Sequence, residues 1–173
     1  MEEPRVITEL VDGEELFHST GFTRLKMTDE GKETSMLFPI QSIGIVDLQD
    51  ELRKSMPRPP KKREFIKKNT PEAKSAGLAH DQWITVLDLA DEEYQIKMEQ
   101  WNLENQWRTV IHALRVTFKD KSGNEIRDYE TKVEALKRKG ITIFHLMKIF
   151  QDIMNLTRDA EGEADFLSVT DLA

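Results

Sequence analysis

The sequence predicts an α+β protein with a small β-rich N-terminal part, a basic proline-rich linker and a mainly helical C-terminal domain with one or two strands. Three observations support this prediction. Short alternating runs separated by turn residues fill the N-terminal part, three prolines fall within positions 57–60, and apolar residues recur at helical spacing from residue 94 onward. The expected organisation is 1–55 (β-rich domain), 56–80 (basic linker or arm), 81–157 (mainly helical domain) and 158–173 (acidic tail).

The N-terminal part is expected to form a hairpin and a short helix. The runs 22–27 and 35–38 flank the turn residues 29–31, an arrangement that predicts two neighbouring strands. Residues 40–46 are apolar and are expected to add a strand. Residues 47–54 begin with acidic side chains and end with basic ones, as the helix dipole favours, and predict a helix.

The middle of the chain is expected to be extended. The prolines at 57–60 stop helices and remove backbone donors, which favours a polyproline-like backbone. Residues 64–70 are expected to form a strand and residues 71–80 a polar loop. Residues 83–89 are rich in β-branched and aromatic side chains and predict a further strand.

Three helices are expected in the C-terminal part. Asp91 is a good N-cap for a long helix that ends near residue 116 or 118. A second helix is expected at 130–139, with Gly140 as the residue that ends it. Thr142 then caps a last helix with apolar residues along one face.

Composition and charge predict a soluble cytoplasmic protein. The chain has no cysteine, which excludes disulfides and thiolate metal sites. Its start is acidic where a signal peptide would be basic and then apolar, and its apolar runs are far shorter than the ~20 residues of a membrane span, so we expect neither export by the usual route nor membrane insertion. The net charge of −7 argues against nucleic acid as a partner of the whole protein.

The sequence contains no arrangement that points to catalysis, a metal or a cofactor. The four histidines have no partner at metal-ligand spacing, and a single helical histidine is usually structural. The carboxylates at 88 and 91–93 form the densest acidic cluster, and helix capping explains them better than calcium binding does. We therefore expect a protein that is not an enzyme and that has no cofactor.

A basic segment stands out against the acidic remainder. Residues 51–75 hold nine basic and three acidic side chains, whereas residues 1–50 hold four basic and eleven acidic ones. Six of the basic residues form a candidate electrostatic arm: Arg58, Lys61, Lys62, Arg63, Lys67 and Lys68. The segment fits a solvated linker, an extended peptide that docks on a partner, or a phosphate-binding patch. Because only Phe65 is interleaved as a stacking aromatic, nucleic acid is the minority interpretation.

The predicted helices carry more apolar surface than a small polar domain needs. Their large or adaptable side chains are Trp101, Trp107, Phe144, Met147, Phe150 and Met154. Most of these are expected in the core, and the surplus predicts a face for a protein client or for self-association. A DNA-reading helix-turn-helix across Gly140 is rejected, because residues 143–154 carry a single basic side chain, Lys148.

Several C-terminal segments follow one another in a characteristic order. They are Trp83–Leu89, Asp91–Tyr94, the Trp-bearing helix, Gly140–Leu146, Asp152–Thr157 and Asp165–Ser168. This succession, over about residues 59–168, is similar to small bacteriophage and prophage tail assembly chaperones. The resemblance implies a non-enzymatic helper that binds tape-measure or tail-tube proteins in the bacterial cytoplasm and leaves the finished particle. The first 55 residues lie outside the resemblance and imply an added domain.

Two other classes of function stay open. A structural virion component or adaptor would use the β-rich part for stacking and the proline-rich arm for docking. A nucleic-acid-associated regulator would use the basic arm, with salt-dependent binding that requires Lys61, Lys62 and Arg63.

Overall fold

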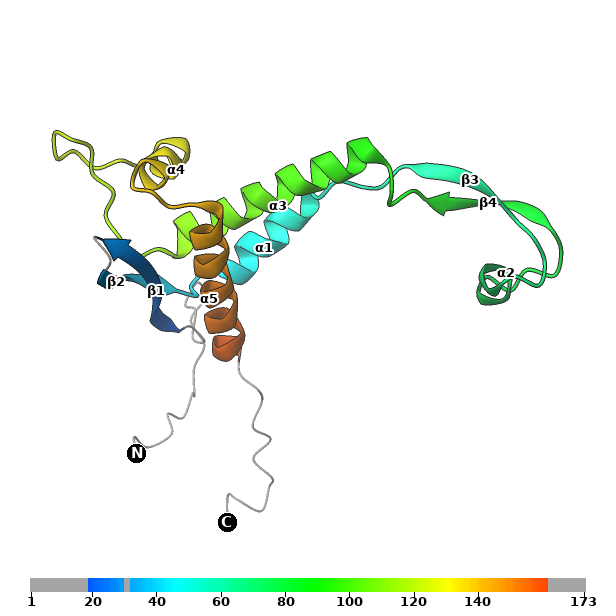
Figure 1. Cartoon of the computed structure of the whole chain (residues 1–173), viewed down its shortest axis with the longest axis horizontal. Helices are drawn as coiled ribbons and strands as arrows, with labels where there is room; N and C mark the ends of the chain where they lie inside the picture. The colour runs from blue at the N-terminus through cyan, green and yellow to red at the C-terminus, as the bar shows by residue number, and fades with distance from the viewer. Residues whose placement is uncertain (1–18, 30–31, 162–173) are drawn as a thin grey trace, which may run out of the picture. The chain divides into compact units, whose positions relative to one another are not determined.

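The computed structural model describes residues 19–29 and 32–161 and confirms the α+β class, with helices and two small antiparallel sheets (Figure 1). The chain divides into two units. Unit 1 contains the described residues of 1–51 and 105–173, and unit 2 contains residues 52–104. The division falls within two helices, α1 (Ile45–Lys54) and α3 (Glu92–Ala113), each of which contributes residues to both units.

Unit 1 contains the hairpin expected near the N-terminus, with longer strands than the sequence indicated. β1 (Thr20–Asp29) and β2 (Lys32–Gln41) pair antiparallel, whereas the predicted turn residues 30–31 lie outside the described residues. Side chains alternate along β1, so that Thr23 and Leu25 are buried while Phe22 is exposed. The hairpin therefore presents one face to the core of unit 1.

The strand expected at 40–46 is wrong beyond Gln41, where β2 ends. Gly44 has a φ of +70°, a left-handed conformation that glycine adopts readily. A Cβ at this position would lie 2.9 Å from Nε2 of His112, so a side chain there would also have to displace the His112 ring. The chain turns at Gly44, and α1 begins at Ile45, two residues before the predicted start.

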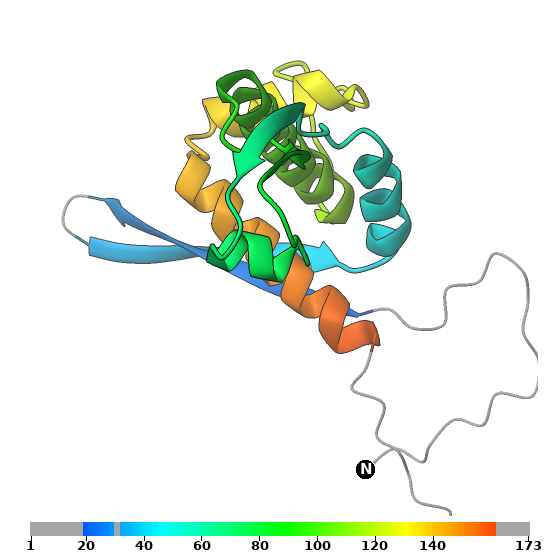
Figure 2. The same cartoon turned by 90° about the vertical axis from the view of Figure 1, so that its right-hand side faces the viewer.

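The core of unit 1 forms between the β1–β2 hairpin, the start of α1, the end of α3, α4 (Tyr129–Arg138) and α5 (Ile143–Glu161). Its buried apolar side chains are Leu25, Ile40, Ile45, Trp107, Val110, Ala113, Leu114, Val133, Leu136, Leu146, Ile149 and Ile153. α5 runs alongside β1, as Figures 1 and 2 show. The hydroxyl of the buried Thr23 donates to Oδ2 of Asp152 at 2.6 Å, which ties the two elements together.

The predicted helix starts and stops are largely confirmed. Oδ1 of Asp91 accepts the backbone N–H of Tyr94 at 2.8 Å, which is the expected cap of α3. Gly140 has a φ of +86° just after α4, as expected of a residue that ends a helix.

The end of α3 differs from the prediction. α3 stops at Ala113, although apolar spacing suggested residue 116 or 118. Leu114 forms an antiparallel β-bridge with Ile40, and the N–H of Arg115 donates to the carbonyl of Pro39 at 2.9 Å. Pairing with β2 therefore replaces the last helical turn.

Unit 2 contains a second hairpin in addition to its parts of α1 and α3. In this hairpin, β3 (Lys61–Ile66) pairs antiparallel with β4 (Gln82–Leu87). β3 begins three residues before the expected strand at 64–70, because its pairing with β4 extends that far. β3 ends at Ile66, so the strand predicted beyond that residue is wrong. The loop expected at 71–80 contains a short helix, α2 (Pro71–Ser75). Of residues 52–104, all of which the structure describes, Ala73 alone is buried.

Candidate functional site

The two tryptophans singled out by the sequence have structural roles. Trp107 is buried in the core of unit 1. Trp101 lies in unit 2 and is partly buried, and its indole N–H lies 3.2 Å from both the carbonyl oxygen of Leu52 and the hydroxyl of Ser55. These contacts satisfy the polar end of the ring and use it to hold α3 against the end of α1.

The other four predicted apolar residues lie on α5 in unit 1, where they line one side of the helix. Phe144 is 78% exposed and Met147 is 52% exposed, while Phe150 and Met154 are partly buried against the core. Ile143, which the sequence reasoning did not select, is 47% exposed beside them. Large apolar side chains that gather on a surface in this way usually mark a contact site.

The spacing of these side chains explains their exposure. The face of α5 that packs on the core carries Leu146, Ile149 and Ile153, all of which are buried. A second apolar row, Ile143, Met147, Phe150 and Met154, runs beside them at intervals of four, three and four residues. We call this row, together with Phe144, the α5 stripe. One helix thus carries two adjoining apolar rows, and the fold buries the first while leaving much of the second exposed.

Polar contacts fix the start of α5 and therefore the direction of the stripe. The backbone N–H of Thr142 donates to Nδ1 of His145 at 3.2 Å, and the Thr142 hydroxyl lies 3.5 Å from the N–H of His145. Threonine is thus the cap that the sequence predicted. His145 completes the cap, and His112 contacts the carbonyl oxygen of Ile43 at 3.1 Å, so both helical histidines have structural contacts.

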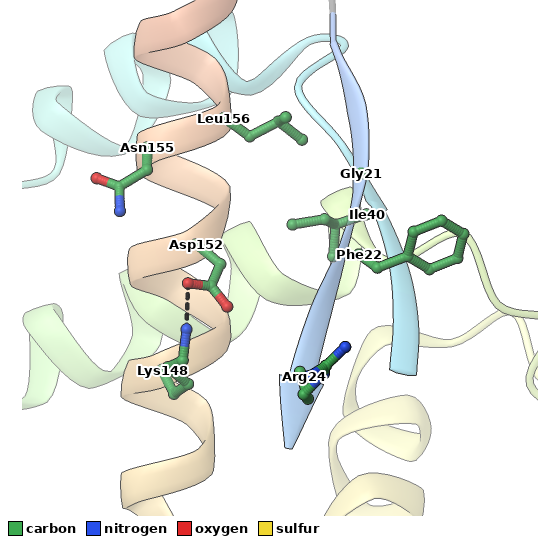
Figure 3. Close-up of a pocket in the computed structure, with 8 residues that line it drawn as sticks. All are labelled: Gly21, Phe22, Arg24, Ile40, Lys148, Asp152, Asn155 and Leu156. Carbon is green, nitrogen blue, oxygen red and sulfur yellow. Dashed lines mark hydrogen bonds and ion pairs between the residues drawn. The ribbon is translucent and has the colours of Figure 1, made fainter. Parts of the chain in front are cut away.

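A pocket of about 300 Å³ lies between α5 and β1 in unit 1 (Figure 3). Two of its charged side chains engage each other: Lys148 pairs with Asp152 at 2.5 Å, and Asp152 also accepts the hydroxyl hydrogen of Thr23. The remaining residues of the lining are Gly21, Phe22, Arg24, Ile40, Asn155 and Leu156. The ion pair at this pocket serves the packing of α5 on the hairpin, and we assign the pocket no ligand.

The six residues of the electrostatic arm lie partly in a strand of unit 2 and partly in the segments on either side of it. Arg58 precedes β3, Lys61, Lys62 and Arg63 belong to it, and Lys67 and Lys68 follow it. All six side chains are exposed. The strand register places Phe65 directly opposite Trp83. This pairing was not visible in the sequence, because the two aromatic residues are far apart along the chain and only the strand register brings them together.

The carboxylate cluster at the start of α3 is structural, as expected. Asp88 pairs with Lys62 at 3.2 Å, and Asp91 caps the helix. Glu93 and Lys97 form an ion pair at 2.6 Å across one helical turn. The hydrogen bond from Lys97 lowers the pKa of Glu93, and the same bond raises the pKa of Lys97.

The described residues bring together no group of three or more histidine, aspartate or glutamate side chains that could hold a metal ion. Within the same part of the chain, no helix has both the length and the apolarity that crossing a membrane requires. Comparisons with protein-family models, with curated proteins and with solved structures find nothing that matches this chain.

Proposed function

We propose that this protein is a non-enzymatic protein-binding factor that acts in the cytoplasm as a tail assembly chaperone, holding a helical segment of a tape-measure or tail-tube protein on the α5 stripe. The observation that carries the proposal is the exposure of Phe144, Met147 and Ile143 at neighbouring positions of α5. Aromatic and methionine side chains adapt to different apolar partners, which suits a protein that binds several sequences in turn.

The spacing of the stripe favours a helical client. Side chains at alternating intervals of three and four residues form a straight row that matches the row on another helix. Burial of each large apolar side chain stabilises a complex by roughly 1.5–3 kcal/mol. Covering Phe144 and Met147 would therefore contribute part of the binding free energy, and contacts along the rest of the stripe would have to add to it to offset the cost of association.

The test is co-expression of the tagged chain with phage tape-measure and tail-tube proteins. We expect the wild-type chain to keep one of them in the soluble fraction and to copurify with it. The double variant Phe144→Asp/Met147→Asp should reduce recovery at least tenfold, because it places two charges in the contact. Leu37→Asp is the matched control, since Leu37 is also exposed and apolar but lies on β2. Equal recovery of the tail protein with the wild type, the double variant and the Leu37→Asp control would overturn the proposal.

The same stripe predicts self-association when no client is present. A second copy of α5 offers the same row of apolar side chains and would cover it in a symmetric contact. Light scattering should show a concentration-dependent rise in mass for the wild-type chain, and the Phe144→Asp/Met147→Asp variant should stay monomeric. A strict monomer at high concentration would count against self-association.

A further inference from the structure

The β3–β4 hairpin of unit 2 has one face that combines aromatic and basic side chains. The register pairs Lys61 with Leu87, Arg63 with Thr85 and Phe65 with Trp83. Side chains of directly opposed residues share a face, and the face repeats every second residue. These six residues therefore lie on one side of the hairpin, which we call the aromatic face, and all six are exposed.

The two aromatic rings lie side by side, and about half of each side chain is exposed. Trp83 is 58% exposed and Phe65 is 44% exposed. Their centroids are 5.5 Å apart with the planes tilted by 56°, and the Arg63 guanidinium lies 5.8 Å from the centre of the Trp83 ring. The pair steadies both rings while leaving much of their surface free for a planar partner.

The charges on the hairpin are separated by face. Glu64, the single carboxylate within the two paired strands, lies on the opposite face from the aromatic rings. Lys62 shares that opposite face, where it pairs with Asp88 at 3.2 Å. The aromatic face carries Lys61 and Arg63 and no acidic residue of the strands, and Lys67 and Lys68 follow directly after β3. Asp81, which precedes β4, is a carboxylate beside these lysines, and it accepts the backbone N–H of Lys68 at 2.7 Å. The aromatic face is thus locally positive in a chain whose net charge is −7.

We propose that the aromatic face binds single-stranded nucleic acid, with bases stacked on Trp83 and Phe65 and phosphates contacted by Lys61 and Arg63. Adjacent stacking rings beside cations are the combination by which proteins bind unpaired strands without reading their sequence. An acidic polypeptide would satisfy the cations but would offer no flat rings to the aromatic pair. This surface lies in unit 2 and is independent of the α5 stripe of unit 1.

The test is fluorescence anisotropy of a labelled 20-nucleotide single strand of mixed sequence, as DNA and as RNA, titrated with the full chain at low salt. We expect saturable binding that weakens with salt. The logarithm of the association constant should fall linearly with the logarithm of the salt concentration, with a slope of roughly −1.5 to −3 for two to four phosphate contacts. Trp83→Ala and Phe65→Ala should each weaken binding about tenfold, as the loss of one stacked base requires.

Three comparisons make the result specific. Trp83→Phe keeps a ring and should stay within about threefold of the wild type, which separates stacking from a general effect of the substitution. Lys62→Ala removes one charge from the opposite face and should lower the affinity for the oligonucleotide about twofold. Arg63→Ala should lower this affinity several-fold more. Circular dichroism checks that each variant is folded.

Polyglutamate of similar length tests the acidic polypeptide as the partner. The proposal predicts that polyglutamate binds at least tenfold more weakly than the oligonucleotide. The proposal would be overturned if polyglutamate bound as strongly as the oligonucleotide. It would also be overturned if Trp83→Ala left the affinity for the oligonucleotide unchanged, or if the oligonucleotide did not bind at low salt.

Discussion

Unit 1 and unit 2 use their apolar residues in opposite ways. In unit 1, side chains from both strands and four helices converge on one core. In unit 2, Ala73 alone is buried, while Phe65, Trp83, Leu87 and Leu89 are exposed. A two-stranded hairpin without a core is held mainly by backbone pairing and by contacts between opposed side chains. Unit 1 therefore supplies stability, whereas unit 2 displays side chains.

The two proposed surfaces follow the same contrast. The α5 stripe adjoins the core, because Phe150 and Met154 are shared between the two. Its position is therefore fixed by packing. The aromatic face has no such support within unit 2, where Phe65, Trp83 and Arg63 contact one another. A rigid apolar row suits a helical partner, whereas a pair of rings on a hairpin without a core suits an adaptable single strand.

The largest expected effect on stability comes from a substitution in the core of unit 1. Leu146→Ala removes a fully buried side chain of α5 and should lower the free energy of unfolding by about 2–5 kcal/mol. Leu87→Ala, the same exchange on the exposed face of β4, should change it by less than about 0.5 kcal/mol. Urea denaturation followed by circular dichroism measures both. Similar losses in the two variants would end the distinction between the units.

Hydrogen exchange tests the same contrast without a substitution. The amides of β3 and β4 should exchange at least ~100-fold faster than those near Val110 and Ile149, because a hairpin without a core opens locally while the core opens with the whole unit. Mass spectrometry of peptides from each unit gives the rates. Equal protection would show that unit 2 has support beyond its own contacts.

A smaller effect is expected where unit 1 depends on a specific polar contact. Asp152→Ala leaves the buried hydroxyl of Thr23 without the acceptor that lies 2.6 Å away, and it should lower the free energy of unfolding by about 1–3 kcal/mol. Asp88→Ala in unit 2 breaks the ion pair with Lys62, whose side chain is well exposed, and should cost less than about 1 kcal/mol. Thr23→Val in the Asp152→Ala background should recover part of the loss, which thermal unfolding can measure.

The smallest effect concerns the start of α4 in unit 1. The side-chain hydrogen bond from Thr131, with its backbone N–H, lowers the pKa of Asp128. The folded state therefore holds the proton less tightly than the unfolded state, and the contribution of Asp128 is complete above the unfolded pKa of about 4 and is lost as the pH falls through the folded pKa.

Asp128→Asn isolates this contribution, because asparagine caps a helix but does not titrate. Below about pH 4 the wild type should lose slightly more stability than the variant, and near pH 7 the difference between them should be constant. Thermal unfolding at a series of pH values provides the measurement. Parallel curves through the acidic range would show that the cap is not coupled to folding.

Local signals in the sequence were sufficient for much of the fold. The cap at Asp91, the stop at Gly140 and the strand near Trp83 depend on residues close to one another, and the structure confirms all three. The helix at 71–75 replaces part of the predicted loop, although its signal is local, since Thr70 is a cap and Pro71 is a favoured first residue.

Sequence alone thus determined the α+β class, most element positions and the presence of surplus apolar and basic side chains. Only the tertiary structure decided which of them are exposed. Pairing with Ile40 ended α3 at Ala113, packing buried Trp107 but left Phe144 in solvent, and strand register set Trp83 beside Phe65. The physical reason is that burial and register depend on contacts between distant segments, which local propensity and spacing do not contain.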